Sequence, residues 1–199
     1  MINHSLVLAS TSEIRRKLAS NFDSSIIFSS PSVDEDHLKE TLKGLEPAQL
    51  CYQLAKAKSL SINNDFPNHL VLGCDQICLL ENKIFSKPRT AERAIDQLKE
   101  LSGKTHHLIG QYVFSKDNAV IHEVEIVCTM NMRELSLNEI QNYVKLDEPF
   151  SACGAYKYEE NGHQLFSEVK GSLEAINGLP LSEIFQAVSY THLRAHETR

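Results

Sequence analysis

The sequence predicts an α/β fold built on a mixed sheet. Strand-like apolar runs and helical periods follow one another from residue 6 to residue 188, with no internal repeat or low-complexity linker. The 199 residues are 42% hydrophobic and 23% charged, which is ordinary globular usage and enough for a substantial core. We therefore expect one domain over residues 1–188.

The first elements are two short strands around a helix. Apolar runs at 6–9 and 26–28 predict strands. Ser10 and Glu13 fit a capping box, so a helix is expected to follow and to end near residue 21.

A longer helix and the most apolar strand come next, after a polar loop at 29–36. Pro47 is typical of a helix start, and the helix is expected to run through residue 63. Segment 70–80 predicts a central strand. The expected buried stripe of the helix is Leu50, Leu54, Ala57 and Leu60.

The second half adds helices and an antiparallel pair. Thr90 is expected to cap a helix over 91–101, and Gly103 to end it. The other expected elements are a short strand from residue 83, an antiparallel pair at 106–115 and 120–132, a helix at 136–146, a strand near 165–169 and a helix opened by Pro180.

The last residues do not match the rest of the chain. Residues 189–199 resemble translated vector sequence, so we leave them out of the fold prediction. His192 and His196 stand four residues apart, but a metal site would need an ordered helix and further ligands.

The charge balance disfavours polyanionic partners. Twenty Lys and Arg against 26 Asp and Glu give a net charge of −6, so we expect no nucleic-acid polymer and no membrane partner. No apolar run is long enough to span a membrane, and the first residues lack a secretory signal pattern. Five cysteines without framework spacing indicate reduced thiols in a cytoplasmic protein.

The first candidate site is the strand-to-helix junction at Ser10, Thr11 and Ser12. Amide groups at a helix start suit an anion, and Arg15 could reach back to a phosphate. The alternative is a plain surface helix whose basic residues are solvated.

Asp75 is the second candidate, because charged residues seldom lie in an apolar strand unless they are paired or metal-bound. It could hold a hydrated cation or act as a general base, or it could simply cap a turn. Lys87 is a third candidate if Pro88 holds it inward; an isolated lysine is more often solvated. Lys56 and Lys58 face different directions on their helix, so at most one points at a shared site.

Other familiar devices are missing from the sequence. Gly103-Lys104-Thr105 lacks the first glycine of a P-loop, since residue 98 is Leu. His106 and His107 are neighbours in a strand and should face opposite sides. Ser10, Ser12 and Cys74 have no histidine at an interpretable spacing, which disfavours a nucleophile.

Eight segments in order resemble the Maf family of nucleoside triphosphate pyrophosphatases. They cover nearly all of residues 5–188. The segments are 8–16 (Leu-Ala-Ser-Thr-Ser-Glu-Ile-Arg-Arg), 33–35 (Val-Asp-Glu), 54–58 (Leu-Ala-Lys-Ala-Lys), 73–76 (Gly-Cys-Asp-Gln), 86–88 (Ser-Lys-Pro), 101–106 (Leu-Ser-Gly-Lys-Thr-His), 154–156 (Gly-Ala-Tyr) and 178–181 (Gly-Leu-Pro-Leu).

The resemblance implies hydrolysis of a nucleoside triphosphate between the α and β phosphates, on an elongated mixed sheet with flanking helices and two lobes around a cleft. By this resemblance Asp75 is the catalytic carboxylate, and Asp75 and Glu35 hold a divalent cation, Mg²⁺ or Mn²⁺. A homodimer is left open. The implied phosphate-binding residues are Ser10, Ser12, Arg15, Lys58 and Lys87.

Three positions bear on the nucleobase: Ile14, Gln76 and Glu159. A carboxylate only accepts hydrogen bonds, so Glu159 would favour a cationic, donor-rich edge such as that of 7-methylguanine. Gln76 and Glu159 resemble the branch that acts on 7-methyl-GTP, whereas Ile14 replaces its aromatic residue. The other departures from the family pattern are Glu13, Ser86 and Cys153. The alternative function is a nucleotide-binding regulator of septum formation that needs no turnover.

Overall fold

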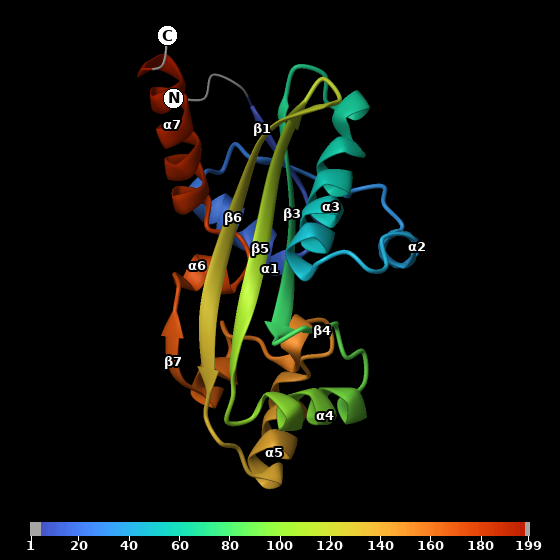
Figure 1. Ribbon diagram of the computed structural model, residues 1–199, viewed down its shortest axis with the longest axis vertical. Helices are drawn as coiled ribbons and strands as arrows, with labels where there is room; N and C mark the ends of the chain where they lie inside the picture. Colours follow the sequence, from blue (N-terminus) through green and yellow to red (C-terminus); the bar gives the residue numbers. More distant parts are fainter. Residues whose placement is uncertain (1–4, 198–199) are drawn as a thin grey trace. The chain divides into compact units, whose positions relative to one another are not determined.

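The computed structural model describes the backbone of residues 5–197 and the side chains of residues 5–189 (Figure 1). The described strands form one seven-stranded sheet in the order β2-β1-β3-β5-β6-β7, with β4 paired to β3. The strands are β1 Leu6–Ala9, β2 Ile27–Ser29, β3 Leu70–Leu80, β4 Lys83–Phe85, β5 Thr105–Lys116, β6 Ala119–Met132 and β7 Phe166–Lys170. Parallel pairing of β1 with β2 and β3, and antiparallel pairing of β3 with β4 and β6 with β7, confirm the mixed sheet.

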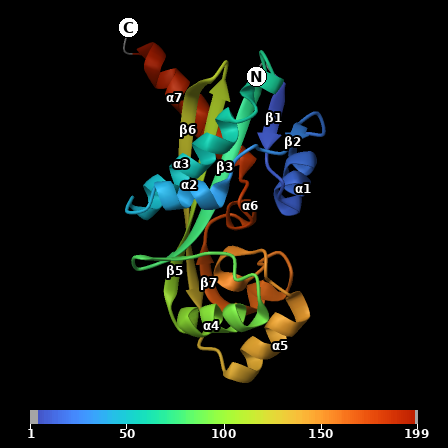
Figure 2. The same ribbon diagram turned by 90° about the vertical axis from the view of Figure 1, so that its right-hand side faces the viewer.

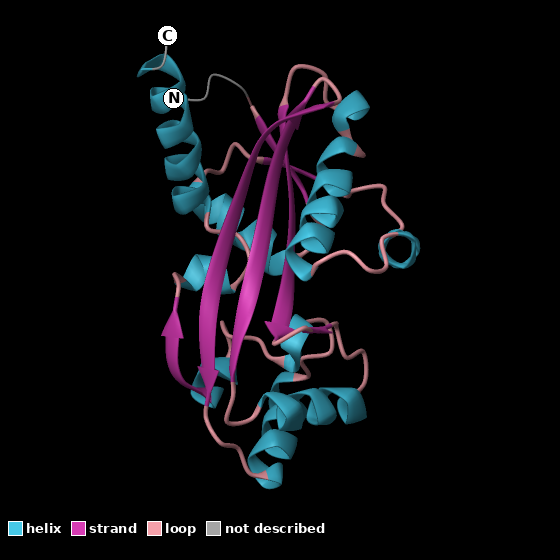
Figure 3. Ribbon diagram, viewed as in Figure 1, coloured by secondary structure: helices cyan, strands magenta, loops and turns pink. Residues whose placement is uncertain are grey.

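The helices flank this sheet, as Figure 3 shows. They are α1 Glu13–Phe22, α2 Glu35–Thr41, α3 Pro47–Leu60, α4 Ala91–Leu101, α5 Leu137–Asp147, α6 Leu173–Ile176 and α7 Leu181–Glu197, with 3₁₀ turns at Asn63–Asp65, Cys153–Ala155 and Asn161–Leu165. The helices expected after Pro47, Thr90, residue 136 and Pro180 are all present.

Two helices were not expected, α2 and α6. Neither has the apolar stripe that marks a longer helix: α2 buries no residue, and α6 is a single turn. Their start signals were present in the sequence, because Asp34 accepts from the N–H of His37 at 3.0 Å and Ser172 accepts from Ala175 at 3.1 Å. The polar loop expected at 29–36 therefore ends at Asp34.

The chain folds into two compact units. The first comprises the residues up to Asp75, Gly110–Ile126 and the residues from Gly178 onward; the second comprises Gln76–Ile109 and Val127–Asn177. Strands β3, β5 and β6 contribute residues to both units.

One core cluster of the first unit lies on one face of its strands. Leu72, Tyr112 and Ile184 are buried there together with Ala19 of α1. Helix α3 packs on the opposite face, and Figure 1 shows α3 and α7 on opposite sides of the strands. Gly73 makes this possible, since a Cβ atom at that position would overlap the backbone of Ala55 and Ser59.

The buried stripe of α3 differs from the expected one. The buried residues are Cys51, Leu54, Ala55, Lys58 and Ser59, whereas Leu50, Ala57 and Leu60 are only half-buried. The small residues Ala55 and Ser59 lie against Gly73, and Lys58 is buried because it pairs with Asp75. The buried face of α3 is therefore not its most apolar face.

Helix α3 also ends at Leu60, three residues before the expected end. The amide of Asn63 donates to the carbonyl of Ser59 at 2.8 Å and to the hydroxyl of Ser115 at 2.7 Å. A side chain that binds the backbone in this way competes with the helical hydrogen bonds.

The expected capping box at the start of α1 is wrong. The helix begins at Glu13 with Ser12 as its N-cap. Ser10 is the residue directly after β1: its N–H donates to the carbonyl of Ser29 at 3.0 Å, and its hydroxyl accepts from the N–H of Ser12 at 3.2 Å. A capping box would need the carboxylate of Glu13 to accept from the N–H of Ser10, but that N–H already donates to Ser29.

The second unit holds α4 and α5, which lie against each other (Figure 2). Ser136 and Glu139 form a full capping box at the start of α5, and Thr90 caps α4 as expected. His106 is fully buried while His107 is half-buried, which confirms that the two face opposite sides. His106 packs with Tyr156 and Phe166 in an aromatic cluster.

Three global expectations can be compared with the structure. None of the five cysteines forms a disulfide. Among the described residues, no helix combines the length and apolarity that crossing a bilayer requires. Helix α7 continues to Glu197, past the expected end of the fold at residue 188, but the side chains of residues 190–199 lie outside the described residues, so their suspected vector origin stays a prediction.

Candidate active site

The strongest cluster of charge in the first unit surrounds Lys58. Its ammonium lies 2.7 Å from Oδ1 of Asp75 and 3.0 Å from Oε1 of Glu35. The side chains of Lys58 and Asp75 are only 8% and 13% exposed, whereas that of Glu35 is 39% exposed. The structure therefore brings together three of the residues that the sequence singled out.

Each of these residues is placed by a different element. Asp75 stands on β3 directly after the tight contact at Gly73, and Lys58 comes from α3, which packs against that glycine. Glu35 is the first residue of α2, whose N-cap Asp34 accepts from the N–H of His37. Because α3 can approach β3 so closely, a long lysine side chain reaches Asp75 without leaving the buried face.

Lys58 is held in its charged form by its partners. Burial alone would lower the pKa of Lys58, but the nearby carboxylates of Asp75 and Glu35 outweigh burial and raise it above the ordinary value. A buried lysine paired in this way is a permanent cation, suited to a polyanionic ligand.

Cys51 was not predicted as a site residue. Its thiol lies 3.8 Å from Oδ2 of Asp75, so both carboxylate oxygens have a neighbouring donor. Burial, followed by the charge of Asp75, raises the pKa of the Cys51 thiol and keeps it protonated. The signal was the spacing: Cys51 and Lys58 are seven residues, about two turns, apart on one helix face.

The start of α1 lies beside this cluster. Ala9 of β1 is in register with Gly73 of β3, so Ser10 follows the carboxyl end of β1, while Asp75 lies in the middle of β3, two residues beyond that register point. Ser12 is half-buried and forms the N-cap of α1. The predicted junction is therefore next to the predicted acid.

Two arginines brace the junction. Arg15 donates from Nη1 to the carbonyl of Cys74 at 3.1 Å. Burial lowers the pKa of Arg15, but Cys74 and Asp75 outweigh it, and the pKa lies above its ordinary value. Arg16, which was not predicted, donates from Nε to the carbonyl of Ser10 at 2.8 Å and lies over the ring of Phe28.

The two lysines of α3 behave as expected. Lys58 points into the cluster, whereas Lys56 lies over the ring of Tyr52, with 6.0 Å from its ammonium to the ring centre. Only one of the two therefore points into this cluster, as their spacing predicts.

The remaining predicted residues belong to the second unit, apart from Ile14, which is half-buried on α1. Gln76 donates from its amide to the carbonyl of Ala175 at 2.8 Å. Lys87 is exposed, so Pro88 does not hold it inward as expected. Glu159 is exposed on a turn. The phosphate role of Lys87 and the base roles of Ile14, Gln76 and Glu159 stay predictions from the resemblance.

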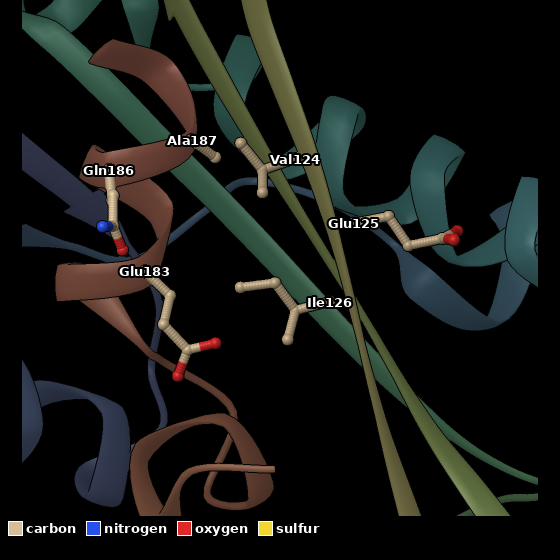
Figure 4. Close-up of a pocket in the computed structure, with 6 residues that line it drawn as sticks. All are labelled: Val124, Glu125, Ile126, Glu183, Gln186 and Ala187. Atoms are coloured by element: carbon tan, nitrogen blue, oxygen red, sulfur yellow. The ribbon is translucent and has the colours of Figure 1, made fainter. Parts of the chain in front are cut away.

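One open hollow of about 360 Å³ lies elsewhere, between β6 and α7 (Figure 4). Val124 and Ile126 point toward Glu183 across it, whereas Glu125 points to the other side of its strand. None of the predicted site residues lines it; the lining residues are Val124, Glu125, Ile126, Glu183, Gln186 and Ala187.

The donor set near Lys58 fits a hard divalent cation. The carboxylates of Asp75 and Glu35 both contact the ammonium of Lys58. Two anionic oxygens therefore already contact one cation. Mg²⁺ and Mn²⁺ prefer oxygen ligands, and Mg²⁺ commonly takes one or two protein carboxylates together with substrate phosphates. Within the described residues, no group of three or more metal-ligating side chains stands together.

Comparison with known proteins gives one family. The model of the family described as Maf-like protein matches residues 5–191. A nucleoside triphosphate pyrophosphatase from Legionella pneumophila is 33% identical over 183 residues, covering 92% of each chain. A 7-methyl-GTP pyrophosphatase from Bdellovibrio bacteriovorus is 36% identical over 190 residues, covering 94% of this chain and 97% of that protein.

A third relative and one solved structure complete the comparison. A 7-methyl-GTP pyrophosphatase from Aliivibrio fischeri is 36% identical over 181 residues. The structure of the Staphylococcus aureus Ham1 protein covers 93% of this chain and 99% of its own, with 12% identity and a TM-score of 0.45, a likeness too low to support an argument about function.

Proposed function

Since the chain belongs to the Maf family, we propose that it is a nucleoside triphosphate pyrophosphatase, which cleaves its substrate between the α and β phosphates into a nucleoside monophosphate and pyrophosphate. The observation that carries this proposal is the buried pair of Lys58 and Asp75, in the middle of β3, where Arg15 donates to the carbonyl of the preceding residue Cys74. Cationic groups of this kind inside an acidic protein suit a compact polyanion.

In the proposed reaction, Asp75 orients the attacking water and accepts its proton. Lys58 and Arg15 oppose the negative charge that develops on the departing pyrophosphate. Ser10, Ser12 and the N–H groups at the start of α1 bind phosphate oxygens. No covalent intermediate is needed, in keeping with the lack of a supported nucleophile.

Glu35 and Asp75 are proposed to hold a divalent cation, Mg²⁺ or Mn²⁺. When bound, such a cation neutralises phosphate charge and makes a coordinated water more acidic. Lys58 would then release Glu35 and turn toward phosphate oxygens, since its ammonium can donate three bonds.

For the substrate, we propose 7-methyl-GTP. N7-methylation makes guanine cationic, and Glu159 supplies a carboxylate to face it. Relatives that bear the name 7-methyl-GTP pyrophosphatase support this choice. We also propose a cytoplasmic location, which five cysteines without a disulfide support.

The test of the activity is Asp75→Asn, with Asp117→Asn as its matched control. Asp117 is exposed in the β5–β6 turn at a positive φ that Asn tolerates well. We expect Asp75→Asn to lose pyrophosphate release by about a thousandfold while it still binds the nucleotide, and Asp117→Asn to keep full activity. Hydrolysis that survives Asp75→Asn would refute the proposal.

The same variant separates the enzyme from a regulator of septum formation. If turnover is the function, the cellular effect disappears in Asp75→Asn. An effect that persists without hydrolysis would favour the nucleotide-binding regulator.

The substrate choice is tested on the unmodified protein. Pyrophosphate release from 7-methyl-GTP, GTP, UTP, dTTP and CTP is measured side by side with Mg²⁺ and with Mn²⁺. We expect the highest kcat/KM for 7-methyl-GTP; equal or lower turnover of it would refute that choice alone.

A further inference from the structure

The turn that carries Glu159 is clamped at both ends by helix α5. The N–H of Lys157 donates to the hydroxyl of Tyr143 at 2.9 Å. At the other end, Asn161 donates to both oxygens of Asp147, from its N–H at 3.0 Å and from its side-chain amide at 2.7 Å. Glu159 is the central residue between these two anchors.

The turn is also closed on itself. The carbonyl of Lys157 accepts from the N–H groups of Glu160 at 3.2 Å and Gly162 at 3.0 Å. Gly162 fits there because a Cβ atom would overlap that carbonyl. With both ends fixed and the backbone paired internally, the backbone that carries Glu159 is held in place by α5.

Asp147 is an unusual residue to bury. It is 4% exposed, and within the described part of the chain it forms no ion pair; its hydrogen-bond donors are the N–H and the side-chain amide of Asn161. A buried carboxylate without a cation is costly unless several donors satisfy it. These donors come almost entirely from the turn, so the stability of the turn and the burial of Asp147 depend on each other.

Tyr143 links the two anchors. It is buried and stands four residues before Asp147 on the same face of α5. Burial raises the pKa of Tyr143, and the charges of Asp147 and Glu159 raise it further, so Glu159 lies within electrostatic reach of this hydroxyl.

We infer that Tyr143 and Asp147 are positioning residues for nucleobase selection: they hold the 157–161 turn so that the carboxylate of Glu159 presents a fixed acceptor to the base edge. This inference rests on the proposed function, because it needs Glu159 to read the base. It adds residues of α5, a helix that carries none of the predicted site residues.

The experiment measures a selectivity ratio, kcat/KM for 7-methyl-GTP divided by kcat/KM for GTP. Tyr143→Phe removes one hydroxyl and keeps the ring. We expect it to lower the ratio roughly fivefold with kcat/KM for GTP within about twofold of the unmodified enzyme. Asn161→Ala, at the partly exposed end of the clamp, is expected to do the same.

Two further variants make the result specific. Ser136→Ala removes the cap of α5 without touching the turn, so it should lower stability and leave the ratio unchanged. Glu159→Ala should lower the ratio at least as much as Tyr143→Phe, and the double variant should lower it no further, because both act through one carboxylate.

The outcomes separate the two claims. If the unmodified protein releases no pyrophosphate from any nucleotide, the proposed function fails. If it is active and Glu159→Ala changes the ratio but Tyr143→Phe and Asn161→Ala do not, the positioning role is refuted. An equal loss on both nucleotides in Tyr143→Phe, matched by Ser136→Ala, would also refute it, since that is the effect of a merely structural residue.

Discussion

Gly73 on β3 lies directly against the backbone of Ala55 on α3, so that a side chain at residue 73 would overlap the helix. The obstructing atoms include the carbonyl oxygen of Ala55 and the N–H of Ser59, which cannot rotate out of the way. The reach of Lys58 to Asp75 depends on this contact, because both residues lie within three positions of it.

Gly73→Ala is therefore expected to lower stability and to disturb the site together. Overpacking a buried contact costs about 1–3 kcal/mol, so the midpoint of thermal unfolding should fall by several degrees. Activity should fall more than stability predicts, because α3 must move away from β3. Gly44→Ala adds the same methyl group in open space and should keep activity; its positive φ alone costs about 1 kcal/mol. Equal behaviour of the two variants would contradict this.

Lys58→Met tests the central cation. The change removes the ammonium and keeps a long apolar stem, so Asp75 and Glu35 lose their shared partner. We expect kcat/KM for the nucleotide to fall by about a hundredfold or more. Lys56→Met, two residues away on the same helix, should retain activity because the ammonium of Lys56 lies over the ring of Tyr52 and not in the cluster around Asp75. Steady-state kinetics of both variants distinguishes the site lysine from the surface one.

Much of the fold could be predicted because its signals are local. The helix after Thr90 and the alternating strand of Val124, Cys128 and Met130 follow from capping residues and period. The face of α3 could not be predicted, because it depends on a glycine of another element and on an ionic partner of Lys58 that lies 17 positions further along the chain.

The site divides in the same way. Asp75 stood out as a charge inside an apolar strand, and that oddity needs no partner to be noticed. Cys51 contacts the carboxylate of Asp75, and Arg16 donates to the carbonyl of Ser10. Folding creates both contacts, so the residue types alone did not mark these two positions as part of the site. The clamp of Tyr143 and Asp147 joins α5 to a turn 14 positions away, a pairing that no sequence period encodes.

A buried polar network at the end of α3 gives a stability prediction. Asn63 donates to Ser59 and Ser115 and accepts from the N–H of Asn118 at 2.9 Å. Asn63→Ala should lower the free energy of unfolding by roughly 2–4 kcal/mol, because it leaves buried partners unsatisfied. Asn64→Ala removes one exposed bond to Asn118 and should cost less than about 1 kcal/mol. Urea unfolding measures the two free energies, provided that the dependence on urea concentration is the same for both variants. Similar unfolding midpoints for Asn63→Ala and Asn64→Ala would contradict the role of the network.

His106 makes the stability of the protein depend on pH. It is fully buried, its Nε2 pairs with the hydroxyl of Tyr156 at 2.9 Å, and its Nδ1 has no partner among the described residues. Burial, followed by the charge of His107, lowers the pKa of His106 from 6.5 to about 4. Between these values the unfolded chain binds a proton that the folded chain does not.

The sign follows from that difference. Above pH 6.5 His106 is neutral in both the folded and the unfolded chain, so the difference in pKa costs no stability. As the pH falls from 6.5 toward 4, the unfolded chain takes up a proton at this residue and the folded chain loses stability relative to it. The loss approaches about 3 kcal/mol. His106→Asn should be less stable at neutral pH yet lose less on acidification, which urea unfolding at pH 7.5, 6, 5 and 4.5 measures. Tyr156→Phe is the control: it removes the hydrogen bond but keeps the imidazole buried, so it should lower stability at every pH and keep the slope. If His106→Asn shows the same acid slope as the unmodified protein, another group is responsible for the acid sensitivity.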